Sequence, residues 1–328
     1  MSVTATTAET QPFGRRAKRF MTDYPLVPLI VLLLLLVLVL NIMQPGIVNQ
    51  RWIANSVKFA IPLALLAGCQ TMTMLTGGID LSVGTVATMA AFFVATQAVD
   101  NPTAVAIVIA LVPALLIGFA NGIGVGVFRV HPLIMTLGTS LIGVGFLQVY
   151  QRTVIASGAK VPDSLTWLGT GLTWGIPNAL LLFVPVAAFL IFMQRRTGFG
   201  RLLYAIGDNE RATRLAGVKY WQVILALYML SSVLAGIMGL LYIGLIRAPS
   251  LSLAEPLVLP SVAAAVIGGT SIFGGRGGYT GTIIGALILT VLTTLLTILQ
   301  MPEGARRILF GAIVLLVTAA YLRIIEER

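Results

Sequence analysis

The chain has 328 residues, of which 58% are hydrophobic and 10% charged, and its formal net charge is +10. A mean hydropathy of +0.98 excludes a soluble globular domain, because a soluble surface does not tolerate so many exposed apolar side chains. The cations stand between apolar segments and the aromatic residues mostly within them, so the charge indicates membrane topology and not nucleic-acid binding.

The apolar segments are continuous over helical span lengths, which predicts an all-α polytopic membrane protein and excludes an alternating β-barrel. A single transmembrane domain, 24–322, is expected between tails at 1–23 and 323–328. The ten expected spans cover about 24–43, 53–76, 82–99, 103–127, 132–151, 176–193, 222–246, 256–269, 279–299 and 305–322. The first span lacks a following cleavage site, so we interpret it as uncleaved. The eighth is short and ends in glycines.

Ten spans place both termini on one side of the membrane. With the N-terminus inside, 14 of the 21 Lys and Arg residues fall on the inner side, which predicts cytoplasmic termini. Glycines recur four residues apart at Gly118, Gly122 and Gly126, a spacing that lets helix backbones pack closely in lipid.

A first inner break, residues 76–84, separates the second and third spans. Gly77 and Gly78 can end one helix, and Asp80 or Ser82 can cap the next, with Gly84 in its first turn. A gating or partner-contact role for this break is the alternative to simple capping. Asp80 is the only carboxylate that stands between two spans in a tight apolar context, and so few intramembrane charges argue against an ion-driven carrier.

The one long polar segment, residues 194–221, lies on the inner side and contains six cations. Asp208 or Asn209 can cap a short helix that Gly217 ends. This helix is either a solvated loop helix or the contact for a soluble partner, which a chain without energy-coupling residues of its own would need. The expected contact residues are Asp208, Asn209, Glu210, Arg211, Arg214 and Gly217.

A second glycine-rich break, residues 268–278, begins with Gly268 and Gly269 and is expected at the same inner face. The two breaks and the polar segment are therefore expected to form one docking surface. The sequence has no phosphate-binding Gly-x-x-x-x-Gly-Lys-Ser/Thr loop, and its single histidine, His131, has no Cys or carboxylate cluster around it. No catalytic residue, metal or bound cofactor is therefore expected on this chain.

The stretches TGGIDLSVG, GRLLYAIGDNERATRLAGV and VIGGTSIFGGRGG resemble, in order and spacing, the permease subunits of ribose-type ABC sugar importers. The resemblance implies a multi-pass permease of the bacterial cytoplasmic (inner) membrane. Its implied partners are a second permease of the same or another kind, two cytoplasmic ATPase domains that bind ATP and Mg, and an extracytoplasmic sugar-binding protein. Residues 208–217 would be the coupling helix, although Asp208 stands where many relatives have glycine.

Two alternatives stay open beside this resemblance. Branched-chain amino-acid permeases have a similar span pattern, and a facilitative or secondary carrier would act without an ATPase. The sugar itself, whether pentose, hexose or polyol, is not indicated by the span residues.

Hydroxyl side chains near the middle of three spans are expected to pass a sugar, unless they bond to carbonyls of their own helices. They are Thr136, Thr139, Ser140, Ser231, Ser232, Thr290, Thr293 and Thr294. On the outer face, Arg152 and Lys160 are expected to dock carboxylates of the binding protein, since complementary charge speeds association. Anchoring at lipid headgroups is the alternative for these two cations.

Overall fold

The computed structural model describes residues 26–154, 158–309, 311–312 and 315, and in this part the protein is helical apart from one short hairpin. The expected tails, 1–23 and 323–328, and most of the expected tenth span lie outside the described residues. The elements are α2 (Leu26–Met43), α3 (Gln50–Leu75), α4 (Val83–Gln97), α5 (Thr103–Gly126), α6 (Pro132–Val154), α7 (Asp163–Thr170), β1 (Leu172–Thr173), β2 (Ile176–Pro177), α8 (Leu180–Arg196), α9 (Gly198–Leu215), α10 (Tyr220–Ile246), η1 (Glu255–Leu257), α11 (Val258–Ile267) and α12 (Tyr279–Ile298).

Six of the described helices, α2, α3, α5, α6, α10 and α12, are long and apolar enough to cross a membrane. The pair α8 and α9, bent by 65° at Thr197, counts as a seventh if it is taken as one span. An all-α polytopic membrane protein is thereby confirmed.

The third and eighth expected spans are shorter than full crossings. At about 1.5 Å per residue, α4 is about 22 Å long and α11 about 15 Å, whereas the hydrocarbon core is about 30 Å thick. The third expected span, 82–99, is shortened by one or two residues at each end, whereas the eighth, 256–269, loses residues 256–257 to the 3₁₀ turn η1 and residues 268–269 to the glycine-rich break. Most of α4 and residues 261–266 of α11 are buried against longer helices, which covers these apolar surfaces within the protein.

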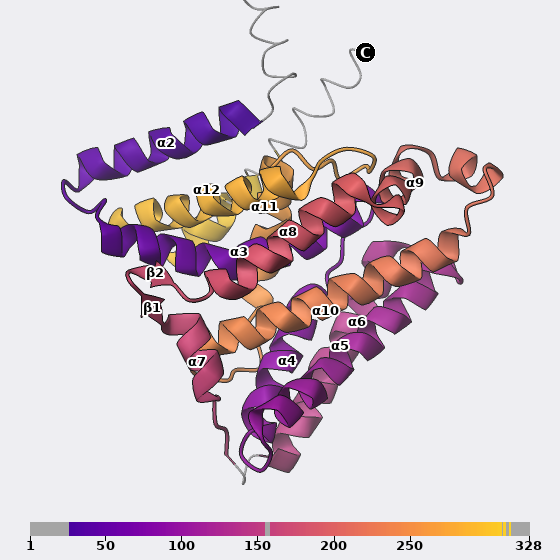
Figure 1. The fold of residues 1–328 in the computed structure, drawn as a ribbon, viewed down its shortest axis with the longest axis horizontal. Coiled ribbons are helices and arrows are strands. Elements are labelled where there is room, and N and C mark those ends of the chain that lie inside the picture. Colours follow the sequence, from indigo (N-terminus) through magenta and orange to yellow (C-terminus); the bar gives the residue numbers. More distant parts are fainter. Residues whose placement is uncertain (1–25, 155–157, 310, 313–314, 316–328) are drawn as a thin grey trace, which may run out of the picture.

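The helices form two groups that meet along α3 and α10 (Figure 1). One group contains α3, α8, α11 and α12, with α2 packed on α12 at the edge; the other contains α4, α5, α6, α7 and α10. Every residue from Ala60 to Leu75 in α3 is buried. This half of α3 is therefore surrounded by other helices at the centre of the fold.

The glycine row on α5 packs against α10, as its spacing predicts. A Cβ atom at Gly118 would lie 2.8 Å from the Ser232 Cβ, and one at Gly122 would lie 2.7 Å from the Leu225 Cδ1. These approaches bring the two backbones into direct contact, which is how helices associate in lipid.

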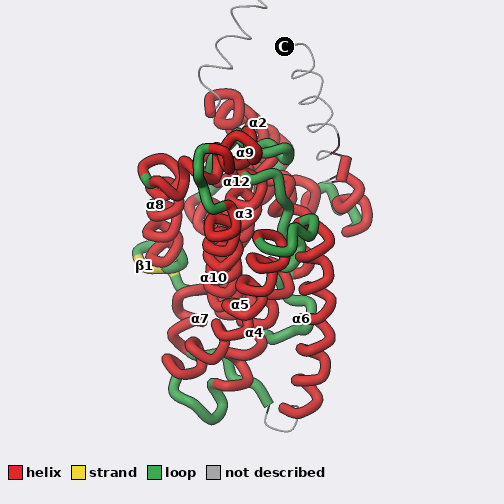
Figure 2. The backbone as a smooth tube through the Cα atoms, turned by 90° about the vertical axis from the view of Figure 1, so that its right-hand side faces the viewer, coloured by secondary structure: helices red, strands yellow, loops and turns green. Residues whose placement is uncertain are grey.

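The long polar segment and the segment after α6 lie at opposite ends of the molecule. Figure 2 shows α9 near one end and α7 toward the other, and Figure 1 places the two at different corners. The connection between α6 and α8 contains α7 and the β1–β2 hairpin, in which Leu172 pairs with Pro177.

Candidate functional site

The last turns of α9 begin and end at the residues that the sequence predicts. Asn209 has non-helical dihedral angles, φ −156° and ψ 95°, and its Oδ1 accepts a hydrogen bond from the Ala212 N–H at 2.9 Å. Asn209 is therefore the cap, rather than Asp208. Gly217 ends the helix with φ +87°, a conformation that costs a side-chain-bearing residue energy.

The polar segment is more helical than predicted, because a first helical piece precedes the cap. It begins at Thr197, whose Oγ1 accepts a hydrogen bond from the Gly200 N–H at 3.2 Å. Leu203 and Ile206 on this piece are buried and anchor it against the transmembrane helices. The region 198–208 is thus a fixed support for the helix turns that follow.

The three expected inner segments lie together at this support. The Gly275 N–H donates to the Leu75 carbonyl oxygen at 3.0 Å, which joins the second glycine-rich break to the end of α3. Gly207 of α9 packs on the same two backbones so closely that a Cβ there would collide with both. Gly77 completes the junction, because a Cβ atom there would lie 3.5 Å from the Phe273 carbonyl oxygen of the second break. The structure therefore brings both breaks and α9 into one continuous surface.

The outward side of the last α9 turns is available to a partner. Leu215 is 83% exposed, and Arg211, Ala212 and Arg214 beside it are exposed as well. A large apolar side chain on a polar surface segment is a frequent anchor in protein interfaces. Leu215 was not among the expected contact residues, although its position between Arg214 and Ala216 near the helix end was a signal for it.

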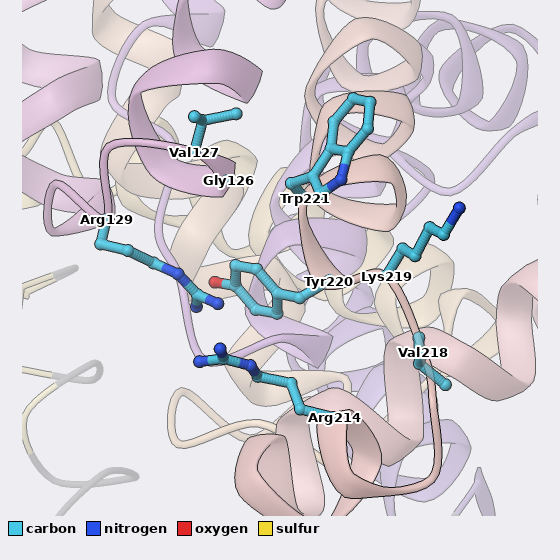
Figure 3. A pocket seen from close by; sticks show the side chains of 8 residues that line it. All are labelled: Gly126, Val127, Arg129, Arg214, Val218, Lys219, Tyr220 and Trp221. Carbon is cyan, nitrogen blue, oxygen red and sulfur yellow. The ribbon is translucent and has the colours of Figure 1, made fainter.

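Glu210 points toward the transmembrane helices and holds the α5–α6 connection. It forms an ion pair with Arg129 at 2.5 Å and lies 3.8 Å from the Arg214 guanidinium. The Arg129 guanidinium in turn lies over the Tyr220 ring, 3.7 Å from its centroid. Figure 3 shows these two side chains pointing toward each other. One arginine thus links α9, α10 and the α5–α6 connection by charge pairing and cation–π stacking.

Asp80 of the first break is completely buried and stabilises its own turn. Its Oδ1 accepts hydrogen bonds from the Ser82 N–H at 2.9 Å and the Ser82 hydroxyl at 2.6 Å. The Ser231 hydroxyl lies 3.4 Å from Oδ2. Burial raises the pKa of the Asp80 carboxyl, and the hydrogen bonds from Ser82 oppose that rise. The side chain caps the chain entering α4, and in this conformation it offers no surface to a partner.

Two amide side chains, which were not among the expected site residues, extend this network. The Gln70 side chain donates to the Asp80 carbonyl at 2.7 Å and accepts from the Asp80 N–H at 3.2 Å. The Asn121 amide donates to the Ser82 hydroxyl at 2.9 Å and accepts from the Thr139 hydroxyl at 2.7 Å. Both amides stand inside apolar spans, where a polar group needs an internal partner. That requirement was the signal that could have identified them.

The expected path hydroxyls fall into two sets. Thr139 and Ser231 belong to the Asp80 network, and Thr136 accepts from the Leu81 N–H at 3.0 Å. Ser140 bonds to the Thr85 hydroxyl at 2.7 Å. The Ser232 Oγ is buried and has no hydrogen-bond partner among the described residues. Most of this set therefore stabilises the junction of α3, α4, α5, α6 and α10.

The second set lies on α12, which packs mainly against α2, α3, α8 and α11. The Thr290, Thr293 and Thr294 hydroxyls each donate to a carbonyl four residues earlier, at 2.8, 2.7 and 3.1 Å, and all three side chains are half-buried. Within one chain, the structure does not bring these threonines together with the α6 and α10 hydroxyls.

The two outer cations are both exposed. Arg152 stands in the last turn of α6, and Lys160 follows in the connection to α7, where its backbone N–H donates to the Ala95 carbonyl at 2.8 Å. That bond anchors the connection to the end of α4 and leaves the lysine side chain exposed.

Comparison with known proteins places this geometry in context. Residues 52–318 match a family model described as branched-chain amino acid transport system / permease component. The chain is 30% identical to the ribose import permease protein of Bacillus subtilis (strain 168) over 279 residues, 85% of this chain and 87% of that protein. It is also 30% identical to the ribose import permease protein of Escherichia coli (strain K12), over 85% of this chain and 88% of the relative.

A third relative is the fructose import permease protein of Rhizobium meliloti, 30% identical over 266 residues, 78% of this chain and 74% of the relative. No solved structure matches the chain.

Proposed function

The chain belongs to the family of branched-chain amino acid transport system permease components, and we propose that it is the permease subunit of an ABC sugar importer. It is a multi-pass protein of the inner membrane. The observation that carries the choice of substrate is the identity of its relatives, which are named for ribose and fructose import and align with most of this chain. These relatives favour a sugar over a branched-chain amino acid.

In the proposed transporter, two permease subunits pair in the membrane, as a homodimer or a heterodimer. Two ATPase domains bind ATP and Mg on the cytoplasmic side, and this chain binds neither. A sugar-binding protein delivers the substrate at the outer face. The proposal includes ten spans with both termini cytoplasmic, which the charge distribution of the inner and outer segments supports.

Residues 208–217 serve as the coupling helix in this proposal. The exposed Leu215, with Arg211 and Arg214 beside it, enters a groove on the ATPase. Glu210 stays on the membrane side, where its pairing with Arg129 passes a displacement of the helix to α5 and α6. Gly207 passes the same displacement to the end of α3 and the second glycine-rich break. These contacts join the ATPase surface to α5 and α6 and, through the second glycine-rich break, to α12, which carries Thr290, Thr293 and Thr294.

The coupling role is tested with Leu215→Ala in the transporter reconstituted with its ATPase and binding protein. Since Leu215 is 83% exposed, its truncation leaves the fold intact but removes an interface anchor. Losing such an anchor costs about 2 kcal/mol, so sugar uptake and sugar-stimulated ATP hydrolysis should fall by more than about tenfold. Arg201→Ala, an exposed change on the first half of α9, is the control and should behave as wild type.

Normal uptake in the Leu215→Ala transporter would disprove this coupling role. The substrate and energy source are tested separately by measuring uptake of labelled ribose, fructose and leucine, with and without the ATPase. Sugar uptake that requires the ATPase is the expected result. Leucine uptake would favour the branched-chain alternative, and uptake without the ATPase would show a stand-alone carrier.

A further inference from the structure

A pocket of about 550 Å³ opens on the inner side between the end of α5 and the start of α10. Arg129, Arg214 and Lys219 line it together with the rings of Tyr220 and Trp221 (Figure 3). The chain brings these residues together from three places, the α5–α6 connection, the last turn of α9 and the start of α10.

The pocket is strongly positive. It is lined by three cations, and the one carboxylate that contacts any of them among the described residues is Glu210, which pairs with Arg129 and lies 3.8 Å from Arg214. The Arg129 and Arg214 side chains remain 38% and 59% exposed, so each guanidinium keeps N–H groups that can reach an external anion. An arginine fork matches the oxygens of a phosphate group.

The apolar surroundings place the pocket at the level of the lipid headgroups. Val127 and Phe128, at the end of α5, are 50% and 73% exposed, and Trp221 is 43% exposed. Tryptophan and tyrosine concentrate where a span leaves the hydrocarbon region, because one part of the ring is apolar and another polar. An occupant of this pocket therefore meets cations on one side and lipid-facing apolar side chains on the other.

We propose that the pocket binds the phosphodiester headgroup of an anionic phospholipid from the inner leaflet. Arg129 binds the phosphate, Lys219 adds positive charge at the rim of the pocket, and the acyl chains follow the apolar surface at Val127 and Trp221. A carboxylate of a docked protein would use the same cations but would leave that apolar surface uncovered. Basic pockets between transmembrane helices on the cytoplasmic side are suited to such headgroups.

The test uses Trp221 as the reporter, in a full-length chain in which Trp52, Trp167 and Trp174 are replaced by Phe. The protein is reconstituted in phosphatidylcholine vesicles, and increasing fractions of brominated phosphatidylglycerol or brominated phosphatidylcholine are added. Bromine quenches tryptophan fluorescence only over a short distance, so the signal reports lipids beside Trp221. Phosphatidylglycerol should quench at a lower mole fraction than phosphatidylcholine.

Substitution of the pocket cations should remove this preference. One cation near the membrane surface changes the affinity for an anionic lipid about fivefold, so Lys219→Gln should reduce the preference by about that factor while keeping the Arg129–Glu210 pair. Adding Arg129→Gln should reduce it further. Arg201→Gln removes the same charge from α9 outside the pocket and should leave the preference unchanged.

Equal quenching by the two brominated lipids in the unsubstituted pocket would overturn the proposal, and so would an equal loss in the Arg201→Gln control. Displacement by millimolar inorganic phosphate would assign the pocket to a free anion instead. The measurement is repeated in the assembled transporter. Loss of the preference there would assign the cations to protein docking, whereas its persistence supports a bound lipid.

Discussion

Replacing Gly207 by alanine tests whether α9, the end of α3 and the second glycine-rich break form one rigid junction. The added methyl group would occupy the space of the Leu75 carbonyl oxygen and the Gly275 nitrogen. Both obstacles are backbone atoms, so no side-chain rotation can relieve the overlap. Forced overpacking costs about 1–3 kcal/mol. Separating the segments also breaks the 3.0 Å Gly275–Leu75 hydrogen bond, which adds about 1 kcal/mol.

The expected loss of stability is therefore about 2–4 kcal/mol. Cys69 provides the assay, because it is the chain's single cysteine and is completely buried, so a thiol-reactive dye reports unfolding of the detergent-solubilised protein on heating. Gly198→Ala is the matched control on α9, since the nearest atom to its Cβ is the Arg201 Nη2 at 3.9 Å. If Gly207→Ala unfolds at the same temperature as Gly198→Ala and wild type, the junction is not the rigid contact described.

Three further predictions address the remaining sites. Asp80→Ala should lower the unfolding temperature more than Asp80→Asn, because asparagine keeps an acceptor for the Ser82 donors. Each buried donor left unpaired costs about 1–3 kcal/mol. Equal losses in the two variants would contradict the capping role of Asp80. In a cysteine-free background, Thr293→Cys should react with small hydrophilic thiol reagents during turnover, whereas Thr136→Cys should be protected, because Thr136 is completely buried. The reverse pattern would place Thr136 on the sugar path and Thr293 away from it. Reversing Arg152 and Lys160 to glutamate should raise the concentration of binding protein needed for half-maximal transport, and an unchanged concentration would place docking elsewhere.

The apolar segments were predictable because membrane insertion depends on local sequence. A span must bury its backbone hydrogen bonds within about 20 apolar residues, so hydropathy alone locates it. The cap at Asn209 and the stop at Gly217 were predictable for a related reason, because both satisfy backbone groups within four residues along the chain. The short lengths of α4 and α11 were harder to predict, since a helix buried inside the protein is as apolar as one that crosses the bilayer.

The contacts of the candidate site were decided by the tertiary structure. Arg129 and Glu210 are 81 positions apart, and no spacing rule connects them. Asp80 and Ser231 are separated by 151 positions. Hydropathy also did not show that the Asp80 side chain is buried and does not face a partner. Sequence patterns thus determined which segments enter the membrane and where helices begin and end, because those depend on neighbouring residues. Only the packing of α3, α9 and α10 decided which polar groups meet, because pairing in a low-dielectric interior depends on distances between remote segments.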